Sequence, residues 1–169
     1  MRSSHVILHS CAMAALLLLT SALPPAHAGS PVAVAVADFD YRDTSGEAVD
    51  QTAQHRERMA IFAALLRDSL QRDHRVVRPA CAQTACTAAS VAPDDLVAAA
   101  RQGGARYLVY GGIRKMSTLV QWGEVQLFDV EREQLVMRRT VTFRGDTDTA
   151  FRRAADFVGE TVSDAIAAQ

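Results

Sequence analysis

Three carboxylates follow a valine-rich segment near the beginning of the chain. Asp38, Asp40 and Asp43 come directly after residues 31–37, which form a short and nearly continuous apolar run. Such a run predicts a strand buried on both faces, and open α/β sheets place ligand sites where such strands end. Because carboxylate oxygens are preferred ligands of hard cations, the three side chains form a candidate site for a divalent metal or small ligand. The structural alternative is turn chemistry, in which Asp38 caps a turn and the other two are solvated or paired with Arg42.

Two cysteines, Cys81 and Cys86, remain after residue 28, with four residues between them. In an oxidising compartment, an even pair this close predicts a disulfide that closes a small loop. A redox dithiol usually has two intervening residues, and a metal site needs further ligands. The sequence therefore favours a structural disulfide over a redox pair or a metal site.

The two histidines after residue 28, His55 and His74, are flanked by charged residues. We expect both on the surface, because a general base needs a nucleophile or substrate group within hydrogen-bond reach and the sequence supplies none. The chain also lacks a Gly-x-Ser-x-Gly turn, a phosphate-binding glycine-lysine loop and a dinucleotide-binding glycine turn. The expectation is a protein without catalytic residues and without a cofactor or resident metal.

Aromatic side chains are the remaining candidates for a binding surface. Trp122, the only tryptophan, has the same strand parity as Val120 and Phe128. If a helix covers that face, Trp122 belongs to the core. If the face is open, Trp122 together with Tyr107 or Tyr110 is a candidate interface, because aromatic residues dominate the energetics of protein interfaces.

The segments that must position these residues show two different spacings of apolar residues along the chain. Valine-rich or alternating runs predict strands, and apolar residues three or four apart predict helices. Proline and two aspartates at residues 93–95 predict a helix start, and Gly103 with Gly104 predicts its end. The predicted order is β-α-β-α-β-β-β-α, giving a mixed α/β fold with one mixed sheet and helices packed on it. The predicted strands are residues 31–37, 74–78, 105–113, 118–130 and 134–143, and the predicted helices are residues 52–72, 93–102 and 147–167.

The first 28 residues read as a cleavable secretory signal. An arginine precedes an apolar stretch, Pro24 and Pro25 interrupt it, and Ala26-His27-Ala28 supplies small residues for cleavage. No later segment is apolar enough to cross a bilayer. We therefore expect residues 29–169 to form a single periplasmic domain without an integral membrane span.

That domain carries 17 basic and 19 acidic residues, a formal charge of −2. Its basic residues are scattered, which gives no electrostatic reason to expect nucleic acid as a partner.

Several of these segments follow a recurring bacterial envelope pattern. They are residues 34–40, the helix end Leu-Arg-Asp-Ser-Leu70, Val-Val-Arg-Pro79, residues 104–112 and Val-Gln-Leu-Phe-Asp-Val130. The chain resembles small exported families of unknown function whose domain is similar to the amino-terminal domain of TolB and to the curli secretion lipoprotein CsgG. The resemblance implies a docking or assembly module that binds another envelope protein, with no catalytic residues to carry over. The chain lacks the acylated cysteine of the lipoprotein members.

Overall fold

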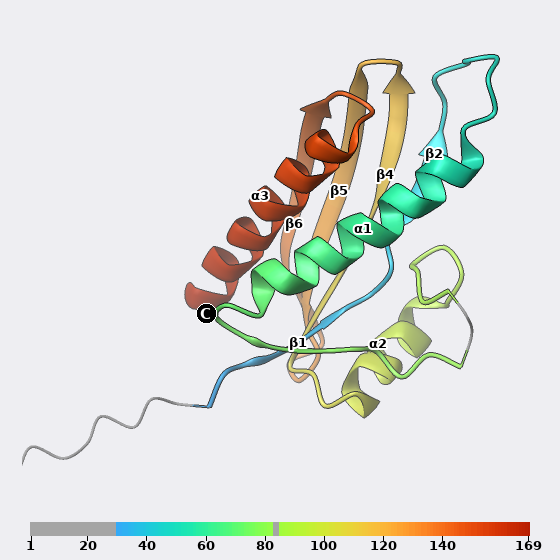
Figure 1. Cartoon of the computed structure of the whole chain (residues 1–169). Helices are drawn as coiled ribbons and strands as arrows, with labels where there is room; N and C mark the ends of the chain where they lie inside the picture. Colours follow the sequence, from blue (N-terminus) through green and yellow to red (C-terminus); the bar gives the residue numbers. More distant parts are fainter. Residues whose placement is uncertain (1–29, 83–84) are drawn as a thin grey trace, which may run out of the picture.

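The valine-rich segment forms the centre of a mixed sheet in the computed structural model, which describes residues 30–82 and 85–169 (Figure 1). The predicted signal segment, residues 1–28, lies outside the described residues. The six strands and three helices are β1 (Ala33–Val36), β2 (Asp40–Asp43), α1 (Thr52–Leu70), β3 (Arg75–Val77), α2 (Pro93–Gln102), β4 (Tyr107–Ser117), β5 (Val120–Asp129), β6 (Gln134–Arg144) and α3 (Asp148–Ala167). The predicted mixed α/β fold is confirmed.

The strands lie in the order β3-β1-β4-β5-β6, and β2 also pairs with β4. β1 runs parallel to β3 and β4, because helical crossovers connect these strands, whereas β4, β5 and β6 form an antiparallel meander. Strand β2 was not predicted. It runs parallel to Gly112–Lys115 of β4. β1 and β2 therefore pair with successive parts of the same strand, β4.

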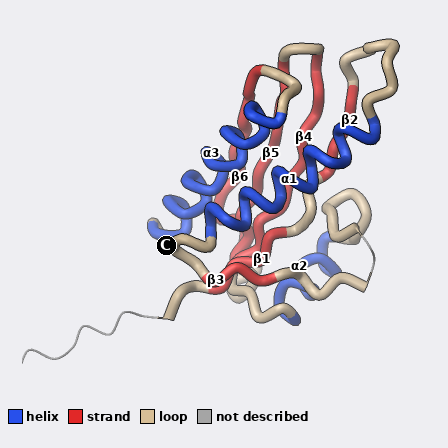
Figure 2. Tube along the Cα trace, in the orientation of Figure 1, coloured by secondary structure: helices blue, strands red, loops and turns tan. Residues whose placement is uncertain are grey.

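The helices cover the two faces of the sheet unequally (Figure 2). α1 and α3 pack on one face and contact each other, and the main core lies beneath them. The predicted α1 stripe of Met59, Phe62, Leu66 and Leu70 is buried there. On the opposite face, α2 covers a smaller cluster that includes Leu96, Leu108 and Val130. No helix of the described residues covers the part of that face nearest the β4–β5 turn.

A β-bulge changes the orientation of side chains in β6. Leu127 pairs with Met137 and the next residue, Phe128, pairs with Leu135, so Val136 is the extra residue. Regular alternation along the predicted strand at residues 134–143 would place Leu135 on the same face as Met137. The structure contradicts that expectation, because the extra residue reverses the side-chain alternation and leaves Leu135 exposed.

Local chemistry sets the helix ends. Pro93 occupies the first turn of α2, Gly104 after the helix has a positive φ of 73°, and Thr147 Oγ1 caps α3 by accepting the Ala150 N–H at 3.3 Å. Within the described ranges, each helix is too short or too polar to cross a membrane.

Candidate functional site

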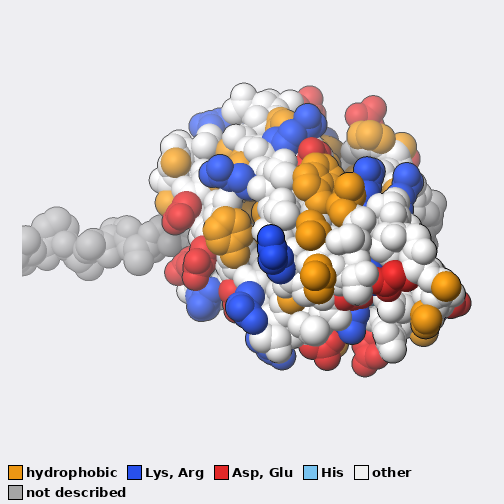
Figure 3. All heavy atoms as spheres, turned by 90° about the horizontal axis from the view of Figure 1, so that it is seen from above, with side chains coloured by type: hydrophobic (Ala, Val, Ile, Leu, Met, Phe, Trp, Pro, Cys, Tyr) orange, Lys and Arg blue, Asp and Glu red, His pale blue; other side chains and the backbone are white. Residues whose placement is uncertain are grey.

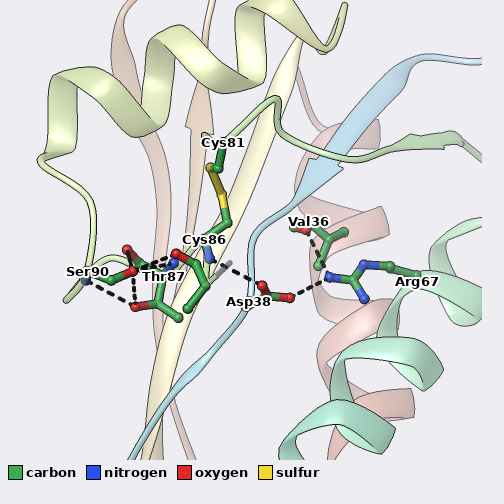
Figure 4. The surroundings of a disulfide bond; sticks show 8 residues. Val36, Asp38, Arg67, Cys81, Cys86, Thr87 and Ser90 are labelled. Carbon is green, nitrogen blue, oxygen red and sulfur yellow. Dashed lines mark hydrogen bonds and ion pairs between the residues drawn. A yellow bond between two sulfur atoms is a disulfide. The ribbon is translucent and has the colours of Figure 1, made fainter. Parts of the chain in front are cut away.

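The three predicted carboxylates point to three different partners. Asp38 accepts hydrogen bonds from Arg67 Nη2 at 3.0 Å and from the Cys86 N–H at 3.3 Å (Figure 4). Asp40 accepts the Ala89 N–H at 3.1 Å. Asp43 accepts the N–H and the hydroxyl of Ser45 at 2.8 and 2.6 Å. The strand end does not bring the carboxylates together, and the described residues contain no group of three or more His, Cys, Asp or Glu arranged for a metal.

The structure contains the predicted disulfide between Cys81 and Cys86, whose Cα atoms lie 5.8 Å apart. Cys86 is also held by the end of β1, because its carbonyl accepts the Asp38 N–H at 2.9 Å. Figure 4 shows the disulfide and the hydrogen bond from the Cys86 N–H to the Asp38 carboxylate. The disulfide and Asp38 therefore fasten the loop before α2 to the centre of the sheet.

A buried charge cluster lies at the other end of β4, and the sequence analysis did not predict it. Lys115, the only lysine of the chain, is 0% exposed. Its Nζ donates to Glu47 Oε2 at 2.8 Å, Gln51 Oε1 at 2.6 Å and Asp146 Oδ2 at 2.9 Å. These acceptors come from the β2–α1 loop and from the segment before α3. One ammonium group therefore joins three distant parts of the chain.

The carboxylates keep this ammonium protonated. Burial alone would lower the pKa of Lys115, but the hydrogen bonds to Glu47 and Asp146 raise it above its ordinary value. Burial would conversely raise the pKa of Asp146, but the hydrogen bonds from His55 and Lys115 lower it overall. Because all three Lys115 protons are engaged, the amine is a structural cation and is not arranged as a nucleophile or base.

His55 belongs to the same cluster, and its predicted surface position is wrong. Its side chain is 4% exposed, and Nε2 lies 3.0 Å from Asp146 Oδ2. The ring also lies against Tyr41, with centroids 4.5 Å apart. Burial, followed by the charge of Asp146, raises the pKa of the Tyr41 hydroxyl. His74 is half-buried, 3.2 Å from Ser163 Oγ.

One sequence signal could have located this cluster. Alternation along β4 places Lys115 on the same face as Val109 and Ile113, which point into the main core. The predicted strand ended at residue 113, so the alternation was not followed as far as Lys115.

The predicted aromatic residues separate onto the two faces of the sheet. Tyr107 is 1% exposed and points into the main core, so it cannot contribute to a surface in this structure. Trp122 and Tyr110 are half-buried on the opposite face. The Arg114 guanidinium lies 5.9 Å from the Trp122 ring centroid, a cation–π distance. Trp122 thus lies on the part of the sheet that no helix covers.

Polar side chains form a network across this face. The Tyr110 hydroxyl donates to Gln126 Oε1 at 3.0 Å, and Gln126 Nε2 donates to Glu124 at 2.9 Å. Arg138 on β6 also donates to Gln126 Oε1, at 3.2 Å. The network links β4, β5 and β6 and fixes the positions of these side chains before any partner arrives.

A hollow of about 360 Å³ opens beside this network, and Gly112 forms part of its lining. A side chain at Gly112 would contact Asp40, with its Cβ 3.3 Å from the Asp40 Cβ. Trp122, Arg114 and Glu124 form the other side of the hollow. We define the open face as the surface formed by Tyr110, Gly112, Arg114, Trp122, Glu124, Gln126 and Arg138.

The end of the molecule above the open face exposes several separate hydrophobic side chains. Val49 in the β2–α1 loop and Met116 and Leu119 at the β4–β5 turn are exposed. In the view onto this end, hydrophobic groups alternate with basic and acidic ones rather than forming one continuous patch (Figure 3).

Solved structures of three bacterial proteins are similar to this chain. TolB from Acinetobacter baumannii is 16% identical with a TM-score of 0.50, and the match covers 82% of this chain but only 30% of TolB. A PelC dodecamer from Paraburkholderia phytofirmans is 15% identical with a TM-score of 0.48, covering 80% of this chain and 87% of PelC. Lipoprotein GNA1162 from Neisseria meningitidis is 12% identical with a TM-score of 0.44, covering 82% and 100%. At its low identity, the TolB match shows a shared fold alone.

Sequence comparison gives the family. No curated protein matches the chain. The family model DUF3280, described as "Protein of unknown function (DUF2380)", matches residues 32–161. That match begins just before β1 and extends into α3, so it spans the whole sheet. Together with the TolB-like fold, it confirms the predicted resemblance, and the chain belongs to the DUF3280 family of proteins of unknown function.

Proposed function

We propose that this protein is a non-enzymatic docking module of the cell envelope that binds another envelope protein through the open face. The observation that carries the proposal is the half-buried Trp122 on a part of the sheet without a covering helix. Exposed aromatic side chains held in place by neighbouring groups are typical of interface hot spots. Arg114 lies over the Trp122 ring, and the network around Gln126 holds Tyr110 and Glu124 in place on the same face.

The charges of the open face suit a protein partner. Arg114 and Arg138 alternate with Glu124, and Asp40 lies at the edge of the hollow. A mixed set of charges favours one complementary protein surface over a uniformly charged polymer. The secretory pattern of residues 1–28 supports the periplasm as the compartment of this proposed interaction.

In-cell photocrosslinking tests the proposal. A photoreactive residue at position 122 should give one discrete adduct with an envelope protein, whereas the same residue at the exposed position Glu57 on α1 should not. Trp122→Ala should weaken binding of that partner by about 30-fold, the size of a central hot spot. Adducts that are equally abundant at both positions would contradict the proposal.

The compartment requires its own measurement. Mass spectrometry of the protein from a periplasmic fraction should find Gly29 at the amino terminus and no alkylated thiol at Cys81 or Cys86. An intact amino terminus on cytosolic material, with both thiols alkylated, would overturn the assignment to the envelope.

A further inference from the structure

Strand β6 is an open edge of the sheet. It is the last strand in the sheet order and, within residues 30–82 and 85–169, pairs with β5 alone, so alternate backbone N–H and C=O groups face outward. At 11 residues, it is about twice the usual strand length of five or six. A long edge of this kind can accept a further strand through backbone hydrogen bonds.

A groove accompanies this edge. Helix α3 runs alongside β6 (Figure 1), and two adjoining hollows of about 450 and 680 Å³ lie between them. Both hollows are lined by Thr140 and Phe157. Phe157 is 51% exposed, although the next residue, Val158, is buried in the core. An added strand would therefore meet the outward backbone groups of β6 on one side and the surface of α3 around Phe157 on the other.

The groove is basic. Strand β6 contains three arginines and no carboxylate. Arg138 points to the open face and pairs with Glu124 at 3.6 Å. Arg139 and, on α3, Arg153 line the groove, and neither has a carboxylate within 4 Å among the described residues. Arg144 borders the groove but shares the strand parity of Arg138, and Asp164 of α3 is the one carboxylate among the lining side chains.

The arginines of the groove determine which kind of added strand can bind beside β6. A second copy pairing β6 against β6 would place arginines of the two chains close together, and like charges on neighbouring strands are destabilising. An extended segment with acidic side chains on the side that faces α3 would instead pair with Arg139 and Arg153. Because every second side chain of a strand points to the same side, apolar residues two positions from the acidic ones would contact Phe157 on that side.

We infer that the groove between β6 and α3 binds an extended segment of a partner protein by adding it to the sheet as a strand, and that this segment presents both acidic and apolar side chains on the side that faces α3. This surface is distinct from the open face, so the inference goes beyond the proposed function and can fail independently of it.

Peptide titration followed by NMR tests the inference. The probe is the blocked eight-residue peptide Glu-Thr-Val-Thr-Glu-Thr-Val-Thr, which places Glu and Val on one side of an extended strand, added to the purified protein. Two peptides serve as controls: one replaces every Glu by Lys, and the other keeps the acidic sequence but has a central Pro, which interrupts strand pairing. We expect the acidic peptide to bind at least tenfold more tightly than either control and to slow hydrogen exchange of β6 amides.

Protein variants locate the site. Reversing both groove charges with Arg139→Glu and Arg153→Glu should weaken binding at least tenfold, whereas Arg152→Glu, an exposed neighbour outside the groove, should change it less than twofold. Phe157→Ala should weaken binding about tenfold without altering the spectrum of the core. If these variants bind as the unchanged protein does, the inference is refuted.

Three further outcomes would overturn it: no binding of the acidic peptide at 1 mM, equal binding of all three peptides, or chemical-shift changes confined to Trp122 and its neighbours. The last result would assign the peptide to the open face and leave the proposed function standing.

Discussion

Replacement of Lys115 by Met tests the role assigned to the buried charge cluster. The substitution keeps the length of the side chain but removes the ammonium that donates to Glu47, Gln51 and Asp146 within 2.9 Å. Two carboxylates then lose their common counter-ion. Asp146 is the more deeply buried of the two, and it keeps its ion pair with Arg58 and its contact with His55. Removing one partner of a buried ion pair typically costs about 3–5 kcal/mol in the free energy of unfolding.

For a domain of this size, that loss corresponds to a decrease of about 10–20 °C in Tm. Urea unfolding followed by circular dichroism at pH 7 measures the free energy, and calorimetry measures Tm. Arg114→Met is the matched control, because Arg114 is the preceding residue but is exposed on the opposite face. The control should change stability by less than about 0.5 kcal/mol.

A double-mutant cycle separates the ion pair from loss of packing. In the Lys115→Met background, Asp146→Asn should cost less than it does in the unchanged protein, because the carboxylate no longer has that partner. If Lys115→Met costs under 1 kcal/mol, or if the two substitutions add independently, the reasoning about the cluster is wrong.

Four other predictions concern stability. The folded state lowers the pKa of Asp146 below its ordinary value of 3.8, so the stability that the ionised carboxylate contributes is present above pH 3.8 and is lost as the pH falls below it. The urea midpoint should therefore decrease below pH 3.8, and it should decrease less in Lys115→Met. Gln121 is 0% exposed and its amide has no hydrogen-bond partner among the described residues, so Gln121→Met should stabilise the fold by about 1–2 kcal/mol in urea unfolding, and a loss of stability would contradict this. Gly159 lies against Ser69 of α1, where an added Cβ would overlap the hydroxyl, so Gly159→Ala should lower stability by about 1–3 kcal/mol despite alanine's better helix propensity; an increase in Tm would show that the helices separate easily. Replacing both Cys81 and Cys86 by Ser opens the small disulfide loop and should cost about 2 kcal/mol, and the unchanged protein should lose a similar amount on reduction.

The sequence alone determined the order and type of most elements. The valines of β1, the three- and four-residue spacing in α1 and α3, and the glycine pair after α2 are local signals with one dominant interpretation each. The pairing of Cys81 with Cys86 was predictable for the same reason, because only two cysteines remain after residue 28 and they lie close together.

Only the tertiary structure decided which of these side chains are buried and which partners they contact. β2 has no apolar alternation, and it is a strand because β4 continues far enough to pair with it. Tyr107 and Tyr110 look equivalent in the sequence, yet their opposite parity relative to α1 and α3 buries one in the main core and leaves the other on the open face. Asp38, Asp40 and Asp43 cluster along the chain but diverge in space, because each finds its partner in a different segment.

Lys115 shows most directly why the sequence alone could not predict which side chains are buried. A lone lysine in a sequence is expected on the surface, because burying an unpaired ammonium is costly. Its burial becomes favourable only when acceptors from positions 47, 51 and 146 converge on it. That convergence depends on contacts between residues 31 to 68 positions apart, and no local pattern encodes it.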